Sequence, residues 1–244
     1  MKIYHGTNAE YLGEILRNGI KPRKLTGKDN WKHQPKEYQS VNNAVYLTTA
    51  YPLYFATATS DNLQLLVLEI DFDKLDKEKV FPDEDFLAQV LSRQKNFTLK
   101  ISHKTIKKAG LSCFQNYWEM SLKKMGTCCY MGTIEPKLIT RYAVINSKIR
   151  KQLLFSMLDP SICLENYLIR GQFYENFVKW IFGDIKELPQ LSEAQENEKI
   201  ISVEDTKEAK GQLKKMFTQQ IEFWTRESKN RDGIEVVELQ KEIK

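Results

Sequence analysis

The sequence predicts an α+β fold followed by a helical C-terminal region, and three observations lead to it. Short apolar runs of strand type recur up to residue 147 and alternate with segments of helical spacing. One of these runs, residues 64–72, is almost continuously apolar, as in a strand that is buried on both faces. Beyond residue 147 the apolar residues recur only at helical spacing. We therefore expect residues 1–147 to form one domain and residues 148–244 a helical region.

The first elements can be placed from their end signals. Residues 2–7 are a strand, and Thr7 and Glu10 have the spacing of a capping box at the start of a helix. Gly19 is the expected end of that helix, because glycine tolerates the backbone conformation of a helix terminus. Residues 23–43 lose all periodicity, which predicts a long loop. Its basic residues are expected either to meet phosphates or to be solvated: Arg23, Lys24, Lys28, Lys32 and Lys36.

Further elements bring the expected number of strands to roughly five or six. Residues 45–48 are a short strand, followed by a helix that begins at Pro52. The apolar run 64–72 is expected to be the central strand. Helical spacing then appears after Pro82 and again from residue 114 to Gly126, and two strands are expected near residues 127–134 and 141–145.

The C-terminal region carries two or three helices between residues 153 and 181, an acidic linker at 187–198 and a final helix from about 204 to 229. The final helix has one apolar stripe. It either docks on the protein's own surface or binds a partner, such as a regulator that restrains the protein or a second subunit.

Composition limits the class of protein. The 244 residues carry a net charge of +5, which permits a polyanionic partner without requiring one. No apolar run is long enough to span a membrane, and the N-terminus has strand rather than signal-peptide character, so we expect a cytoplasmic protein without membrane contact. Four cysteines without a Cys/His zinc spacing give no reason to expect a metal.

Two motifs bear on function. The first strand ends in His5-Gly6-Thr7, and the second reads Val45-Tyr46-Leu47-Thr48-Thr49. A histidine at a strand end is often only structural, but a glycine beside it lets a flat ligand approach the backbone. Together, in this order and with the helices between them, the motifs resemble the ADP-ribosyltransferase superfamily. The likeness is to its His-Tyr-Glu branch, which includes poly-ADP-ribose polymerases, diphtheria-toxin-like toxins and rifampin ADP-ribosyltransferases. It covers roughly residues 1–147.

The resemblance implies a split, mostly antiparallel sheet and an NAD site. It implies that His5 bonds the nicotinamide ribose, that the Gly6 backbone holds the carboxamide and that Tyr46 stacks on the nicotinamide ring. Tyr54 is a candidate for the opposite ring face, although it is equally typical of a core aromatic. Thr7 and Arg23 are further candidates for contact with NAD. His5 and Tyr46 should line one cleft, and side chains on opposite faces of the sheet would contradict this assignment.

The third residue of the motif should be acidic, because a carboxylate stabilises the oxocarbenium-like state in which the nicotinamide bond breaks. In polymerase-type members it lies on the strand that here begins at Thr127, where this chain has no carboxylate. In rifampin-type members it follows the central strand, where this chain has Asp83-Glu84-Asp85. Glu84 is our first choice, then Asp83 and Asp85, and after them Glu119 and Glu135. An acidic helix start that only stabilises the helix dipole is the alternative.

The sequence thus predicts an enzyme that transfers ADP-ribose from NAD to an acceptor. The expected acceptor is a macromolecule, RNA or DNA ahead of protein, since the basic loop interleaves lysines with aromatic side chains as single-strand binders do: Trp31, His33 and Tyr38. A bacterial toxin or phage-defence effector restrained by an antitoxin would fit these features. The alternatives are a module that binds NAD or ADP-ribose without catalysis, and an RNA 2′-phosphotransferase, whose family has histidine where this chain has Tyr46.

Overall fold

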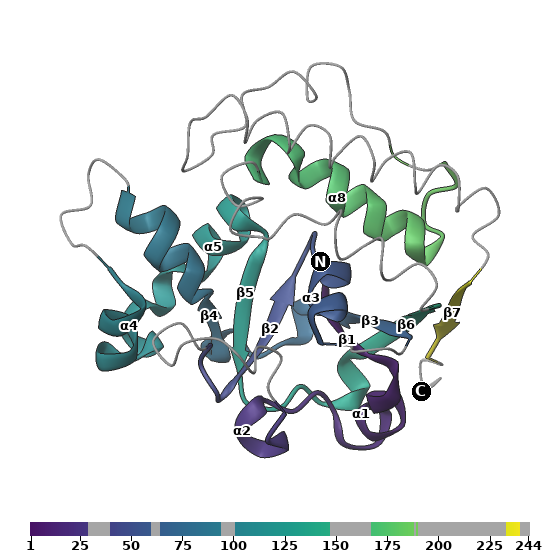
Figure 1. Ribbon diagram of the computed structural model, residues 1–244, viewed down its shortest axis with the longest axis horizontal. Helices are drawn as coiled ribbons and strands as arrows, with labels where there is room; N and C mark the ends of the chain where they lie inside the picture. The colour runs from purple at the N-terminus through teal and green to yellow at the C-terminus, as the bar shows by residue number, and fades with distance from the viewer. Residues whose placement is uncertain are drawn as a thin grey trace.

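The computed structural model describes residues 1–28, 40–59, 64–93, 101–146, 167–187, 189 and 233–239, and its described part is an α+β structure built on one antiparallel sheet (Figure 1). The sheet has seven strands in the order β4-β5-β2-β1-β3-β6-β7. The strands are β1 (Lys2–Asn8), β2 (Ala44–Thr48), β3 (Leu65–Asp71), β4 (Val80–Pro82), β5 (Thr127–Met131), β6 (Ile139–Ile145) and β7 (Ile234–Glu238). The predicted α+β class and the antiparallel pairing are confirmed.

The helices cover the sheet on both faces. They are α1 (Leu12–Asn18), α2 (Arg23–Thr26), α3 (Pro52–Thr59), α4 (His103–Ala109), α5 (Trp118–Met125) and α8 (Tyr167–Phe182), with further helical turns at Phe86–Val90, Leu91–Arg93 and Leu111–Tyr117. Side chains of α3 and α8 share an apolar cluster with Tyr4, Leu65 and Val67. Ile15 of α1 belongs to the cluster formed on the other face by the alternate strand residues. This alternation explains why β3 is buried along nearly its whole length.

The strands β1 and β2 pair at one position only, Tyr4 opposite Thr48. By contrast, β1 pairs with β3 along its full length, and β2 pairs with β5 along its full length. The sheet therefore consists of two well-paired parts, β4-β5-β2 and β1-β3-β6-β7, joined at a single residue pair. Beyond that pair, His5 and Gly6 on one strand and Tyr46 on the other border a gap.

Gly6 is required by the packing of α3 on β1. A Cβ atom at Gly6 would lie 1.8 Å from the carbonyl oxygen of Pro52 and 2.8 Å from the backbone nitrogen of Ala56. The helix α3 thus rests directly on the backbone of β1, which only glycine permits. This contact fixes Tyr54 and Phe55, one turn into α3, relative to His5.

Several local expectations need correction. The residue that caps the turn after β1 is Asn8, whose side chain accepts from the backbone N–H of Glu10, and not Thr7. Thr7 is instead part of β1, opposite Leu66. Gly19, with φ +80°, does end α1, as predicted.

Other corrections concern strands and the loop. The loop expected from residue 23 begins with the short helix α2, which ends at Gly27. The expected central strand, β3, lies beside the centre, which β1 occupies. Strands β4 and β7 were not predicted. β4 has only three residues, and β7, although Asp232-Gly233 precedes it, pairs with β6, a strand far earlier in the chain.

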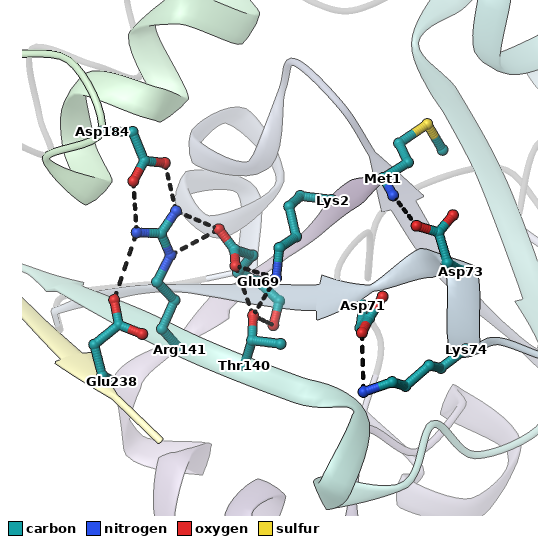
Figure 2. Close-up of polar contacts among 10 residues, drawn as sticks. All are labelled: Met1, Lys2, Glu69, Asp71, Asp73, Lys74, Thr140, Arg141, Asp184 and Glu238. Atoms are coloured by element: carbon teal, nitrogen blue, oxygen red, sulfur yellow. Dashed lines mark hydrogen bonds and ion pairs between the residues drawn. The ribbon is translucent and has the colours of Figure 1, made fainter. Parts of the chain in front are cut away.

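The C-terminal region shares the sheet of the first 147 residues. Strand β7 pairs with β6 along its length, and α8 packs on the sheet through Phe182, whose ring stacks on Tyr4 at 5.5 Å. Figure 2 shows the ion network at this junction. Arg141 of β6 contacts Glu69 of β3 at 2.6 Å and binds Asp184, just after α8, through both guanidinium NH2 groups. These contacts tie α8 and the sheet together.

Glu69 is the buried centre of that network. It is 1% exposed, and its carboxylate also accepts from Thr140 at 2.6 Å and pairs with Lys2 at 3.0 Å. A buried carboxylate is stable only when its oxygens are fully paired, as they are here. At the β7 edge, Glu238 lies 3.5 Å from Arg141.

Some predicted features lie outside the described residues. These are the aromatic residues of the basic loop, most of the acidic linker and the final amphipathic helix from about residue 204 to 229. Across the described ranges, none of the helices combines the length and the apolar character that a membrane crossing requires.

Candidate active site

A cavity of about 260 Å³ lies where β1 and β2 diverge. Its wall is formed by the ends of these two strands, the α1–α2 segment, α3 and the turn after β4. The site residues that the sequence predicted in the two motifs, in the acidic turn, at Arg23 of α2 and at Tyr54 of α3 all line it: His5, Gly6, Thr7, Arg23, Tyr46, Tyr54, Asp83, Glu84 and Asp85. Segments up to 80 residues apart in the chain are thus brought to one cavity.

The His5 imidazole lies in the gap between β1 and β2. Its Nδ1 is 2.9 Å from the backbone carbonyl oxygen of Tyr46. A carbonyl only accepts, so Nδ1 carries the proton and donates, which leaves Nε2 as an acceptor in the neutral ring. Burial lowers the pKa of His5, and the hydrogen bond to Tyr46 only partly offsets this. In the neutral ring, Nε2 can therefore accept a hydrogen bond from a hydroxyl group.

His5 and Tyr46 line the same cavity, although regular strand pairing would place their side chains on opposite faces of the sheet. Continuing the register from Tyr4 and Thr48 would place Gly6, and not His5, opposite Tyr46. The strands separate after that pair, and the His5 ring contacts the β2 backbone through its hydrogen bond to the Tyr46 carbonyl oxygen. Both residues consequently border the same cavity, although strand alternation alone assigns them to different faces.

Tyr46 is held at its hydroxyl. It donates to Glu84, with 2.6 Å to each carboxylate oxygen, and accepts from the backbone N–H of Val41 at 2.9 Å. Burial and the neighbouring Glu84 raise the pKa of Tyr46 well above 10, so the hydroxyl remains a donor. These hydrogen bonds fix the position of the hydroxyl, and with it the direction in which the side chain points beside the cavity.

Glu84 and Asp83 are both buried, at 5% and 4% exposed. Burial raises the pKa of Glu84, while the hydrogen bond from Tyr46 lowers it. Burial and the two neighbouring acids raise the pKa of Asp83 well above its usual value. Burial thus works against the charged form of both carboxyl groups, whereas a cation in the cavity would favour it.

Asp83 lies close to the start of β5, the strand on which the sequence analysis found no carboxylate. Pro82 pairs with Cys128, which brings Asp83 beside Thr127, at the start of β5. Ser121 links the two segments: it accepts from the Asp83 backbone N–H at 3.1 Å and donates to the Thr127 carbonyl at 2.7 Å. The turn after β4 thus carries carboxylates to the strand end where the polymerase-type pattern would have its acid.

Asp85 differs from its two neighbours. Its side chain is 48% exposed, and its Oδ1 lies 2.7 Å from Nε2 of His103, at the start of α4. The hydrogen bond to Asp85 is the main cause that raises the pKa of His103. His103 does not line the cavity itself but holds a carboxylate that does.

Basic side chains line the same cavity from the α1–α2 segment. They are Lys21, Arg23 and Lys28. Arg23 donates to the Ser40 carbonyl at 2.7 Å, and the Lys28 ammonium lies over the Tyr11 ring, 3.4 Å from its centre. Glu14 of α1 also lines the cavity and lies 3.7 Å from Lys21, so the cavity combines three acids of the turn after β4 with a mainly basic α1–α2 segment.

The comparisons with known proteins leave the family open. No protein-family model matches this chain, and no curated protein does. Two chains of solved structures match. One is EcPltA, with 12% sequence identity over 59% of this chain and 75% of that chain and a TM-score of 0.33. A similarity of this strength establishes neither family nor activity.

The sequence analysis also named residues that the cavity does not include and missed others that it does. Glu119 lies on α5, and the exposed Glu135 pairs with Lys137; neither lines the cavity. His103 was missed because nothing in the local sequence links it to Asp85, 18 residues earlier. Tyr11 and Lys21 were missed because they resemble the surface of an amphipathic helix and its end. Among the described residues, no group of three His, Cys, Asp or Glu side chains is arranged to hold a metal ion.

Proposed function

We propose that this protein is an NAD-dependent ADP-ribosyltransferase that releases nicotinamide and transfers ADP-ribose to a macromolecular acceptor. The observation that carries the proposal is the hydrogen bond between Tyr46 and Glu84 at a cavity that His5 also lines. These three residues were singled out from the sequence for one reaction, and nothing in local sequence requires them to meet. Their convergence on one cavity supports that reaction.

The distribution of charge in the cavity fits NAD. The nicotinamide ring of NAD is cationic and would be attracted to Glu84 and its neighbours, while the diphosphate is anionic and would be attracted to Arg23 and Lys28. At about 260 Å³ the cavity is smaller than the typical ligand pocket of about 300–1,000 Å³. It would accommodate the reacting nicotinamide ribose, with the remainder of the dinucleotide along the basic segment.

Each residue then has a role consistent with its contacts. The Tyr46 ring would stack on nicotinamide, and Tyr54 would contact it from α3. Nε2 of His5 would accept a ribose hydroxyl, and the backbone of Gly6, which lacks a Cβ atom, would approach the carboxamide. Glu84 would face the positive charge that grows on the ribose as the bond to nicotinamide breaks.

One observation favours a second candidate, a module that binds NAD or ADP-ribose without catalysis. Both oxygens of Glu84 are engaged by Tyr46, and burial raises the pKa of the carboxyl group. A neutral Glu84 would stabilise an oxocarbenium ion poorly. In the proposed enzyme, the positive charge of bound NAD keeps Glu84 ionised.

Nicotinamide release separates these candidates. The purified protein is incubated with NAD, and free nicotinamide is measured by chromatography, beside NAD affinity by calorimetry. We expect release by the wild type and a loss of about 100-fold or more in His5→Ala, Tyr46→Ala and Glu84→Gln. Glu135→Gln, which changes an exposed glutamate outside the cavity, is the matched control. A wild type that binds NAD and releases nothing would indicate the binding module.

The acceptor is proposed to be RNA or DNA rather than protein. The support is the positive net charge, the cations at the cavity and the lysine-rich segment after α2, whose aromatic residues lie outside the described part of the chain. An enzyme of this kind would act as a bacterial toxin or defence effector held in check by an antitoxin. Incubation with labelled NAD and separate pools of cellular RNA, DNA and protein decides the acceptor, and label in protein alone would refute nucleic acid.

A further inference from the structure

The three consecutive acids at the cavity, Asp83, Glu84 and Asp85, differ in their exposure and in their hydrogen-bond partners. Asp83 and Glu84 are 4% and 5% exposed, and Glu84 has both oxygens bound by the Tyr46 hydroxyl. The Asp85 side chain is 48% exposed and lines the same cavity. Within the described part of the chain, its Oδ1 contacts His103 and its Oδ2 has no partner. Asp85 is thus the acid that an incoming molecule can meet.

We propose that Asp85, positioned by His103, is the general base that takes the proton from the acceptor nucleophile. This inference rests on the proposed ADP-ribosyl transfer and adds a catalytic residue to it. Glu84 and Asp85 then have separate roles in the reaction. Glu84 stabilises the positive charge on the ribose, and Asp85 removes the proton from the attacking group.

The reaction balances as follows. The bond between the ribose C1 and the nicotinamide nitrogen breaks, and its electron pair leaves with nicotinamide, which becomes neutral. An oxygen or nitrogen lone pair of the acceptor forms the new bond to C1. The proton of that acceptor group passes to Oδ2 of Asp85 and from there to solvent. With water as the acceptor, the products are ADP-ribose, nicotinamide and one proton.

A carboxylate is basic enough for this step. The acceptor hydroxyl becomes strongly acidic only as its bond to the cationic ribose forms, so the proton is transferred late and to a modest base. His103 restricts rotation of the Asp85 carboxylate by binding Oδ1, which keeps Oδ2 available. The hydrogen bond with Asp85 raises the pKa of His103, although partial burial opposes it, and the charged imidazole strengthens the contact with Asp85.

Azide distinguishes a base from a structural residue. Azide is an anionic nucleophile without a proton, so its attack needs no general base. Nicotinamide release is measured for wild type, Asp85→Asn, His103→Asn and the exposed control Asp73→Asn, with water alone and with added sodium azide. We expect Asp85→Asn to lose about 100-fold with water, with unchanged KM for NAD. Azide should restore its release and yield ADP-ribosyl azide, which mass spectrometry identifies.

The other variants make the test specific. His103→Asn should lose less, about 10-fold, through kcat alone, and azide should restore it too. Glu84→Gln should stay slow with azide, because the ribose carries the same positive charge in the transition state whichever nucleophile attacks. Full activity of Asp85→Asn with water, or a loss that azide does not restore, would overturn the role of Asp85 while leaving the transferase proposal intact. A wild type that releases no nicotinamide with either nucleophile would overturn both.

Discussion

The hydroxyl of Tyr46 donates to the carboxylate of Glu84, at 2.6 Å from each of its oxygens. Tyr46 comes from β2 and Glu84 from the turn after β4, and strand β5 lies between these two strands in the sheet. The contact therefore requires a small side chain on β5 between the two strands. The residue there is Cys129, which is opposite both Tyr46 and Phe81. A small residue there leaves room for Tyr46 and Glu84 to meet.

Removing only the Tyr46 hydroxyl should separate ring stacking from the support of Glu84. In Tyr46→Phe we expect NAD affinity within about threefold of wild type, because the ring remains. The rate of nicotinamide release should fall about 10-fold, and the free energy of unfolding by about 1–2 kcal/mol, because the Val41 N–H and Glu84 lose a buried partner. Calorimetry with NAD and urea denaturation measure these effects. An affinity as low as that of Tyr46→Ala would contradict the stacking role.

Gly6→Ala should damage the fold at the site. The new Cβ atom would lie 1.8 Å from the Pro52 carbonyl, and this neighbour is backbone, so α3 must move away from β1. We expect a loss of about 3 kcal/mol in the free energy of unfolding, at the upper end for overpacked sites. Gly13→Ala is the control: nothing lies within 4 Å of its added Cβ, and alanine in helix α1 should stabilise by about 0.5–1 kcal/mol. Equal stability of the two variants would contradict the close approach of α3.

Asp83→Asn should stabilise the protein at neutral pH. The folded-state pKa of Asp83 is raised above its usual 3.8, so the unfolded chain loses this proton at a lower pH than the folded protein. The contribution of wild-type Asp83 to stability is therefore greatest below about pH 3.8 and is lost as the pH rises toward the folded-state pKa. Asparagine can keep the contact with the Asp85 N–H but has no charge to bury.

Urea denaturation at pH 4 and pH 7.5 measures this difference. At pH 7.5 the free energy of unfolding should be larger for Asp83→Asn than for the wild type. At pH 4 the difference between the two free energies should be smaller. The exposed Asp73→Asn controls for the substitution itself. A gap that is larger at pH 4 than at pH 7.5 would show that the folded-state pKa of Asp83 is lowered.

Arg141→Met should loosen the attachment of α8 and β7. It leaves Glu69 buried without its guanidinium partner, and breaking a buried pair costs about 3–5 kcal/mol. Glu238→Gln, which removes the exposed partner of the same arginine, should cost less than about 1 kcal/mol. The double variant Arg141→Met/Glu69→Met should recover most of the loss, because the charges left without these partners, Lys2 and Asp184, are exposed and none is buried. Hydrogen exchange of α8 and β7 amides reports the loosening, and unchanged exchange in Arg141→Met would show that the network does not hold them.

Local patterns predicted the elements whose signals are complete within a short stretch. The burial of β3 follows from its apolar run, the end of α1 from Gly19, and the end of α5 from Gly126. Strand β4 was not predicted, because three residues are too few to show an alternating strand pattern. Asn8 and not Thr7 is the cap, because pairing with β3 extends β1 by one residue. In both cases, pairing with a strand that is distant in the sequence determines where the strand lies or ends.

The sequence by itself determined the α+β class, the ends of the main elements and the residue types that can bind a cationic ring, a ribose hydroxyl and a diphosphate. Only the tertiary structure decided which acid meets Tyr46, that His5 donates to the β2 backbone through Nδ1, that His103 holds Asp85, and that the C-terminal β7 adds a strand to the sheet. The reason is physical: side-chain periodicity is set by neighbours along the chain, whereas hydrogen-bond partners and pKa values depend on which segments pairing and burial bring together.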